Sequence, residues 1–193
     1  IGAMVVAPLL GPNMALALGL TLDDRALIQR AAKSAVAGIL VCFGVAMVLS
    51  FLVDVDPAVS ELSSRTGPRV ADIVLAVAAG TAGTLAYTTG APTYLVGVMV
   101  AVALLPPTVA SGLFLAHGHF AQAGGAALLT AINATAVVLS SMLTFLASGM
   151  RPRIWWQEAQ ARRTATRAAL ALMGLLGVLG GLSYLSRGWG AGG

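Results

Sequence analysis

Charged residues are confined to a few short segments of this chain, and the long stretches between them carry none. Four charge-free stretches run from 1 to 22, 34 to 53, 73 to 150 and 168 to 186. Each can hold at least one apolar helix of the roughly 20 residues that cross a bilayer. Charged residues make up only 9% of the 193 positions, too few to cover a soluble domain. The pattern predicts an all-α, polytopic membrane helix bundle.

The longest charge-free stretch exceeds the length of one membrane helix. Turn-forming residues at 89–92 and 117–119 divide it into three segments. With the other stretches, this predicts about six transmembrane helices. We expect them at 1–20, 34–53, 70–87, 93–116, 121–147 and 168–185. Residues 1–193 then form a single transmembrane domain, in which 151–167 is a cytoplasmic basic linker before an additional last helix.

The basic residues predict an orientation. Eight of them lie in the loops after the first and fifth predicted helices, and three lie on the opposite side. Because cytoplasmic loops are enriched in Lys and Arg, we expect a multi-pass protein of the cell membrane with the eight inside. Both ends of the chain are then outside, so we expect a further helix before Ile1. The segment 151–167 fits either a helix along the headgroups or a solvated linker with an aromatic belt.

Composition excludes several function classes. The formal net charge is +4, but the basic residues lie beside apolar spans, so no nucleic-acid partner is expected. The single cysteine, Cys42, excludes an intramolecular disulfide and a thiolate metal cluster. His117 and His119 lack a placed third ligand, so we predict no metal site. No phosphate-binding loop or catalytic constellation can be assembled, and we expect neither enzyme activity nor a cofactor.

Two segments of the chain resemble each other at a spacing of 95 residues. Residues 1–20 align with 96–115 with nine identities, including one glycine and one proline. The corresponding predicted helices are three spans apart, so they cross the bilayer in opposite directions. We predict an inverted-topology repeat that relates 1–53 to 96–147, the alternative being chance similarity between apolar segments. Such repeats are common in secondary transporters, which bind substrate near the midplane between the repeats.

Proline pairs interrupt both repeat-related helices near the middle. Pro8 and Pro12 lie in one helix, and Pro106 and Pro107 lie in the other. Each proline leaves the carbonyl four residues before it without a helical donor, which is costly in hydrocarbon unless another group meets it. We predict two proline-broken helices whose carbonyls and helix N-termini form a site for a cation, a substrate or an anionic group. The alternative is a pair of routine kinks.

Polar side chains follow each proline pair, and others lie in the middle of the fifth predicted helix. At this depth they either line a site or hydrogen bond neighbouring helices. No ionisable residue lies at the centre of a span, which argues against a buried proton relay. The candidate substrate or ion site comprises Pro8, Gly11, Pro12, Asn13, Pro106, Pro107, Thr108, Ser111, Thr130 and Asn133.

Glycines recur at helical spacing in two predicted helices. The third helix carries Gly80 and Gly83, and the last one carries Gly174, Gly177, Gly180 and Gly181. Small residues let helix backbones approach closely in membranes, so we expect both faces to be packing surfaces.

Two sequence phrases resemble a known family. They are IGAMVVAPLLGP, from Ile1 to Pro12, and AVALLPP, from Ala101 to Pro107. They are similar to the bacterial hydrophobic-domain membrane family known as domain of unknown function 389, and the chain through its fifth predicted helix fits that pattern. The resemblance implies another membrane helix before Ile1, with three helices in each inverted unit and the last helix as an addition. It implies no activity, because the family has none established.

Two functions fit these features. One is a secondary transporter or channel for a small solute or ion, which predicts a water-accessible cavity between Pro12 and Pro107. The alternative is a membrane-embedded scaffold or sensor that anchors and oligomerises soluble domains, which predicts a dry core and a large interface. The expected partners are the lipid bilayer, a small solute or ion, and further copies of the chain.

Overall fold

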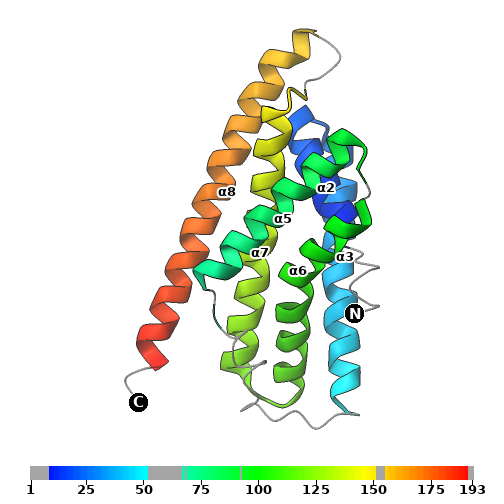
Figure 1. The fold of residues 1–193 in the computed structure, drawn as a ribbon. Helices are drawn as coiled ribbons and strands as arrows, with labels where there is room; N and C mark the ends of the chain where they lie inside the picture. Colours follow the sequence, from blue (N-terminus) through cyan, green and yellow to red (C-terminus); the bar gives the residue numbers. More distant parts are fainter. Residues whose placement is uncertain (1–8, 52–66, 68, 92, 151–154, 191–193) are drawn as a thin grey trace.

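Helices make up nearly all of the described part of the chain, which in this computed structural model comprises residues 9–51, 67, 69–91, 93–150 and 155–190 (Figure 1). The helices are α2 (Leu10–Leu22), α3 (Arg25–Ser50), α5 (Val70–Thr89), α6 (Thr93–Ala116), α7 (Phe120–Ala147) and α8 (Trp155–Gly190). No strand occurs in these residues, so the all-α prediction is confirmed.

Two helices begin earlier than predicted. α3 begins at Arg25 instead of residue 34, and α8 begins at Trp155 instead of residue 168. The added turns carry basic residues, which are good helix formers even where they do not enter an apolar layer. From Trp155 onward, the expected linker 151–167 is therefore the first part of α8, while 151–154 lie outside the described residues. A charge-free stretch of sequence therefore identifies the apolar part of a helix, but it does not show where the helix begins.

Two aspartates shape the turn between α2 and α3. Asp23 ends α2 in the left-handed conformation, at φ 58°. Asp24 then caps α3, because its Oδ1 accepts a hydrogen bond of 3.0 Å from the amide of Leu27. This bond satisfies one of the four amides that have no partner at a helix start.

Replacing Asp24 by alanine should lower the free energy of unfolding by about 1 kcal/mol, because the Leu27 amide loses its acceptor. Thermal unfolding in detergent measures the effect. Asp24→Ser keeps a capping oxygen and should retain most of the stability. If both variants lose the same amount, the cap does not stabilise α3.

The hairpins α2–α3 and α6–α7 are built alike. Asp23 and Gly118, 95 residues apart in the chain, end the first helix of each hairpin at φ 58° and 76°. The next amide, of Asp24 or His119, donates to the carbonyl five residues back at 3.0 or 2.9 Å. The second helix of each hairpin begins one residue later. Figure 1 shows that α3 and α7 run in opposite directions, as do α2 and α6.

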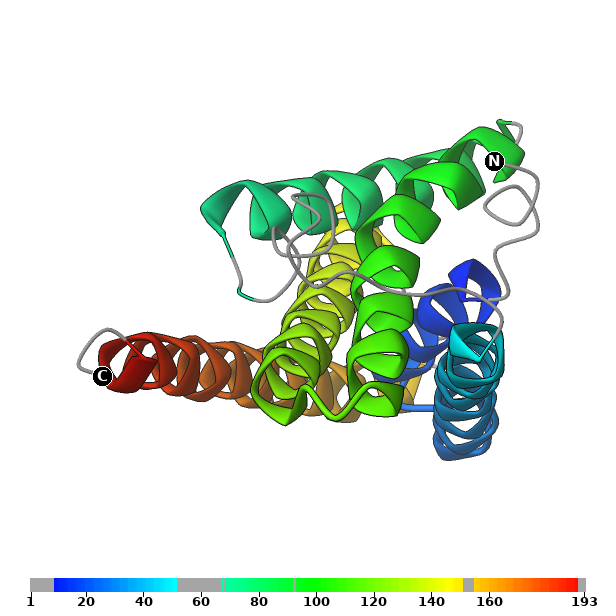
Figure 2. The same cartoon turned by 90° about the horizontal axis from the view of Figure 1, so that it is seen from below.

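α7 is the central helix of the bundle. It packs against α2, α5, α6 and α8 (Figure 2). Its buried side chains include Leu129, Val137 and Phe145, and also most of its polar residues. The amide and hydroxyl side chains in the middle of α7 therefore face protein. Exposing them to the hydrocarbon of a membrane would cost free energy.

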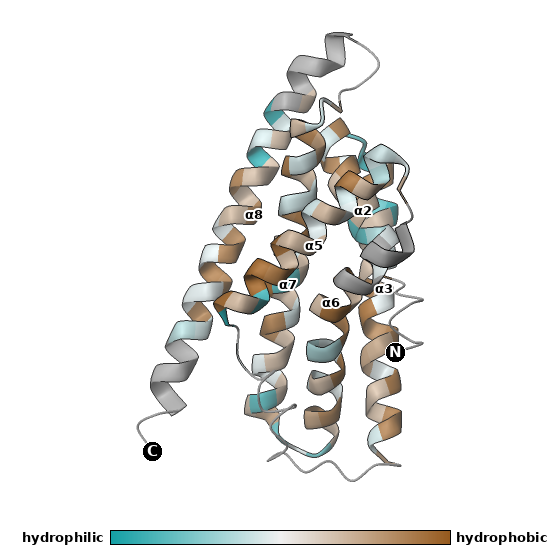
Figure 3. Ribbon diagram, viewed as in Figure 1, coloured by the Kyte–Doolittle hydropathy of each residue, from teal (hydrophilic) through white to brown (hydrophobic). Residues whose placement is uncertain are grey.

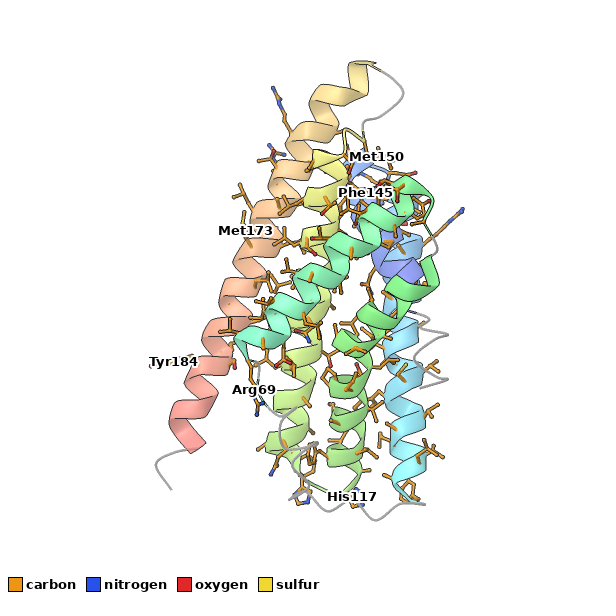
Figure 4. The ribbon with its side chains drawn as sticks, in the orientation of Figure 1. Arg69, His117, Phe145, Met150, Met173 and Tyr184 are labelled. Atoms are coloured by element: carbon orange, nitrogen blue, oxygen red, sulfur yellow. The ribbon has the colours of Figure 1, made fainter. Side chains whose placement is uncertain are left out.

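The outer helices present apolar side chains outward (Figure 3). On α8, Met173 and Tyr184 are exposed and point away from the bundle (Figure 4). An outward apolar surface of this kind suits lipid better than water. Four described helical segments are long and apolar enough to cross a membrane: Arg25–Ser50, Val70–Thr89, Phe120–Ala147 and Arg163–Tyr184. The larger number of six spans stays a prediction.

The basic segments gather at one end of the bundle. The first turns of α3 and the first half of α8 lie at the end that carries Met150 (Figures 1 and 4). Arg69 lies toward the opposite end, where His117 is found (Figure 4). The described basic residues are thus divided between the two ends as the loop charges predict.

Candidate functional site

The proline pair of α6 lies inside a continuous helix. α6 runs from Thr93 to Ala116 through Pro106 and Pro107, so the prediction of a break is wrong here. Helical bonds on both sides keep the chain helical, and each proline ring pushes against the preceding turn, which bends the helix. Figure 2 shows α6 bent along its length. A continuous helix has no N-terminus at this point, so the anion-attracting end expected there is not formed.

The proline site of α2 is different. Pro12 lies in the first turn of a helix that begins at Leu10, where its missing amide costs no helical bond. Gly11 is exposed in the same turn. Pro8 lies outside the described residues.

An amide side chain of α7 meets the carbonyl that Pro107 leaves without a helical donor. Asn133 Nδ2 donates to the carbonyl oxygen of Ala103 at 2.8 Å. Both residues are 2% exposed. Asn133 therefore joins α7 to α6, which was one of its two predicted roles, and satisfies a carbonyl that would otherwise be unpaired in the core.

The partner of Asn133 was missed, although the sequence contained a signal for it. Ala103 and Asn133 lie fifteen residues before and fifteen residues after Gly118. In an antiparallel hairpin with its turn at Gly118, such residues face each other. Proline four residues after Ala103 then identifies the carbonyl that needs a donor.

Three hydroxyls extend the polar contact along the same hairpin. Thr108 and Thr130 each donate to the carbonyl four residues back in their own helix, at 2.7 and 3.1 Å. Their hydroxyl oxygens lie 3.3 Å apart across the interface. Ser111 Oγ donates to the carbonyl of Ala123 on α7 at 2.9 Å. Thr108, Ser111, Thr130 and Asn133 are thus brought together, all buried between α6 and α7.

Asn13 is the counterpart of Thr108 in the other hairpin. Its Nδ2 donates to the carbonyl of Leu9, four residues back, at 2.6 Å, just as Thr108 donates to Leu104. Leu9 and Leu104 are fully buried and belong to one hydrophobic cluster. The two proline sites therefore border the same apolar cluster, each through its leucine.

Gly80 makes a close crossing between α5 and α7. Its carbonyl accepts hydrogen bonds from Thr84 Oγ1 at 3.0 Å and from Ser141 Oγ at 3.1 Å. A Cβ at Gly80 would lie 2.6 Å from the carbonyl oxygen of Val137. The prediction of a packing face is confirmed for Gly80.

The glycines of α8 do not form a packing face with the described residues. A Cβ at Gly174, Gly177, Gly180 or Gly181 would meet no atom within 4 Å, so the prediction is not confirmed for contacts within the described part of the chain. α8 instead packs on its alanine side, where Ala161, Ala165 and Ala169 are buried. Alanine at every fourth position forms one face of a helix.

One buried polar atom among the described side chains has no hydrogen-bond partner. It is Oδ1 of Asn133. A buried acceptor without a donor costs about 1–3 kcal/mol. A ligand or water that interacts with Oδ1 would therefore stabilise the folded protein.

Comparisons with known proteins agree with the resemblance. The family model described as "Domain of unknown function (DUF389)" matches residues 4–139. Uncharacterized protein MJ0678 of the archaeon Methanocaldococcus jannaschii is 34% identical over 170 residues, which cover 88% of this chain and 53% of the relative. The chain thus spans about half the length of this curated relative. No solved structure matches. The chain belongs to the DUF389 family, which is not restricted to bacteria.

Proposed function

We propose that this protein is a multi-pass protein of the cell membrane that provides a pathway for a small solute or ion. The observation that carries the proposal is the likeness of the α2–α3 and α6–α7 hairpins, which share turn bonds at a spacing of 95 residues and run in opposite directions. This likeness supports an inverted-topology repeat, and transporters built on such repeats bind their substrates where the repeats meet.

The position of the polar residues supports the same proposal. The proline sites of the two hairpins converge on one cluster through Leu9 and Leu104. Beside it, Thr108, Thr130 and Asn133 form a buried polar group on helices that are otherwise apolar. Polar groups within membrane helices often mark the path of a solute. The pathway then follows the α6–α7 interface at the bend.

Cysteine labelling tests for water in this interface. Thr108→Cys and Asn133→Cys, each in a Cys42→Ser background, should react with a small water-soluble thiol reagent in intact membranes. A thiol reacts as its thiolate, which needs water, so we expect labelling about tenfold faster than at a dry position. Met142→Cys is the matched control, since Met142 is fully buried in an apolar cluster on the same helix. Protection at 108 and 133 equal to that at 142 would contradict the pathway.

The scaffold alternative has an observation of its own. Asn13, Thr108, Ser111 and Thr130 all hydrogen bond to protein groups. The exposed apolar faces of α3 and α8 offer surface for further copies of the chain. A scaffold of this kind predicts full protection in the labelling experiment, together with a stable homo-oligomer in crosslinking of intact membranes.

A further inference from the structure

The unpartnered oxygen of Asn133 has a fixed position. Its amide is anchored by the bond from Nδ2 to the Ala103 carbonyl at 2.8 Å. Turning the amide over would place two oxygen acceptors against each other, so Oδ1 cannot exchange places with Nδ2. Oδ1 is therefore held beside the bend of α6 as an acceptor, in a residue that is 98% buried.

Protons are scarce among the neighbouring hydroxyls. Thr130 lies one turn before Asn133 on the same face of α7, and Thr108 lies opposite at 3.3 Å. Each hydroxyl has one proton, and each donates it to a carbonyl of its own helix. Either hydroxyl could also donate across the 3.3 Å between the two oxygens, so two protons serve three contacts. Together with Asn133 Oδ1, acceptors therefore outnumber donors at the bend.

The surroundings decide which ligand such oxygens suit. No charged residue occurs between 73 and 150, so a divalent cation would bring two charges into a region without a counter-charge. An anion would face acceptors only. A monovalent cation brings only one charge and can be met by neutral oxygen acceptors.

We propose that the neutral oxygens at the bend, Asn133 Oδ1 with the Thr108 and Thr130 hydroxyls, bind a monovalent metal cation. This rests on the proposed function, because it names the solute class of the same pathway. The repeat-related position in α3 is Gly38, which faces the side chain of Leu9 and offers no such oxygen. Within the described residues, the proposed oxygens therefore belong to the α6–α7 hairpin and have no counterpart at Gly38 in α3.

Salt-dependent thermal unfolding of the full-length protein in detergent tests the site. Sodium, potassium, lithium, ammonium and choline chlorides are compared at equal ionic strength. A bound cation stabilises the folded state, so a saturating small metal cation should raise Tm by about 5 °C over choline. An effect of ammonium alone would assign the site to a hydrogen-bonding donor and overturn the metal proposal.

Two variants and one control locate the effect. Asn133→Ala and Thr130→Val should each weaken the apparent affinity for the cation by at least about tenfold, the loss of one good ligand. Either variant suffices if the other does not fold. Thr135→Val is the control, because the Thr135 hydroxyl also bonds to a carbonyl of its own helix, Ala131 at 2.7 Å, but is not a proposed ligand. It should retain the full shift.

The outcomes separate this inference from the proposed function. Equal Tm in every salt, or a shift that Asn133→Ala and Thr130→Val leave intact, would overturn the cation site and leave a buried water as the donor to Oδ1. Labelling at residues 108 and 133 without a salt effect would keep the pathway and remove the cation. A cation-specific shift with both positions protected and no sodium flux into liposomes would keep the site and remove the pathway.

Discussion

Replacing Gly80 by leucine should lower the free energy of unfolding by about 3 kcal/mol, because it overpacks a close helix crossing. The Cβ would lie 2.6 Å from the Val137 carbonyl oxygen and 3.0 Å from Ser141 Oγ. The Val137 carbonyl oxygen is a backbone atom that cannot rotate out of the way, so α5 has to move away from α7. That movement also breaks the bond from Ser141 to the Gly80 carbonyl. Thermal unfolding in detergent and the yield of monodisperse protein measure the loss.

Gly174→Leu on α8 is the matched control for this substitution. Its Cβ would meet no atom within 4 Å, and leucine is a better helix former than glycine. We expect its stability to be unchanged or slightly raised. A similar loss in both variants would show that glycine is needed for a reason other than the α5–α7 crossing.

A double-mutant cycle should show that Asn133 and Pro107 are coupled. Asn133→Ala leaves the Ala103 carbonyl unpaired and buried, at a cost of about 2 kcal/mol. Pro107→Ala restores a backbone amide that can donate to the same carbonyl. In that background, Asn133→Ala should cost about 1 kcal/mol less, which is the interaction free energy of the cycle. Unfolding of the four proteins in one salt solution gives each value.

Pro12→Ala provides the control cycle. Pro12 occupies the equivalent position in the first turn of α2, and its amide belongs to a different helix from Ala103. Its effect should add to that of Asn133→Ala. Additivity in both cycles would mean that the bond between Asn133 and Ala103 does not compensate for the proline.

Much of the architecture could be predicted because apolar length and charge are strong constraints on a helix in lipid. The predicted helix 93–116 coincides with α6, and 70–87 and 121–147 lie within about two residues of α5 and α7. The starts of α3 and α8 could not be predicted in this way, because a basic helical turn outside the apolar layer is still helical. The inverted-topology repeat stays a prediction, which the like turns at Asp23 and Gly118, 95 residues apart, support.

The candidate site was predicted less completely. The sequence selected Thr108, Thr130 and Asn133, because polar groups in apolar helices need partners. It predicted a helix break at Pro106 and Pro107, where the helix is continuous. The sequence shows which backbone hydrogen bonds a proline removes, but it does not show which side chains of neighbouring helices replace them. The bond from Asn133 to Ala103 depends on the distance between two helices, which their side chains set together.

The sequence alone determined that this chain forms apolar helices, where most of them lie and which residues are polar within them, because these properties depend on local composition and spacing. Only the tertiary structure decided that Gly80 packs closely while Gly174 does not, and that Asn133 Nδ2 has a partner while Oδ1 has none. These differences depend on the local distance between neighbouring helices. Two residues of the same type can therefore have entirely different atoms opposite them.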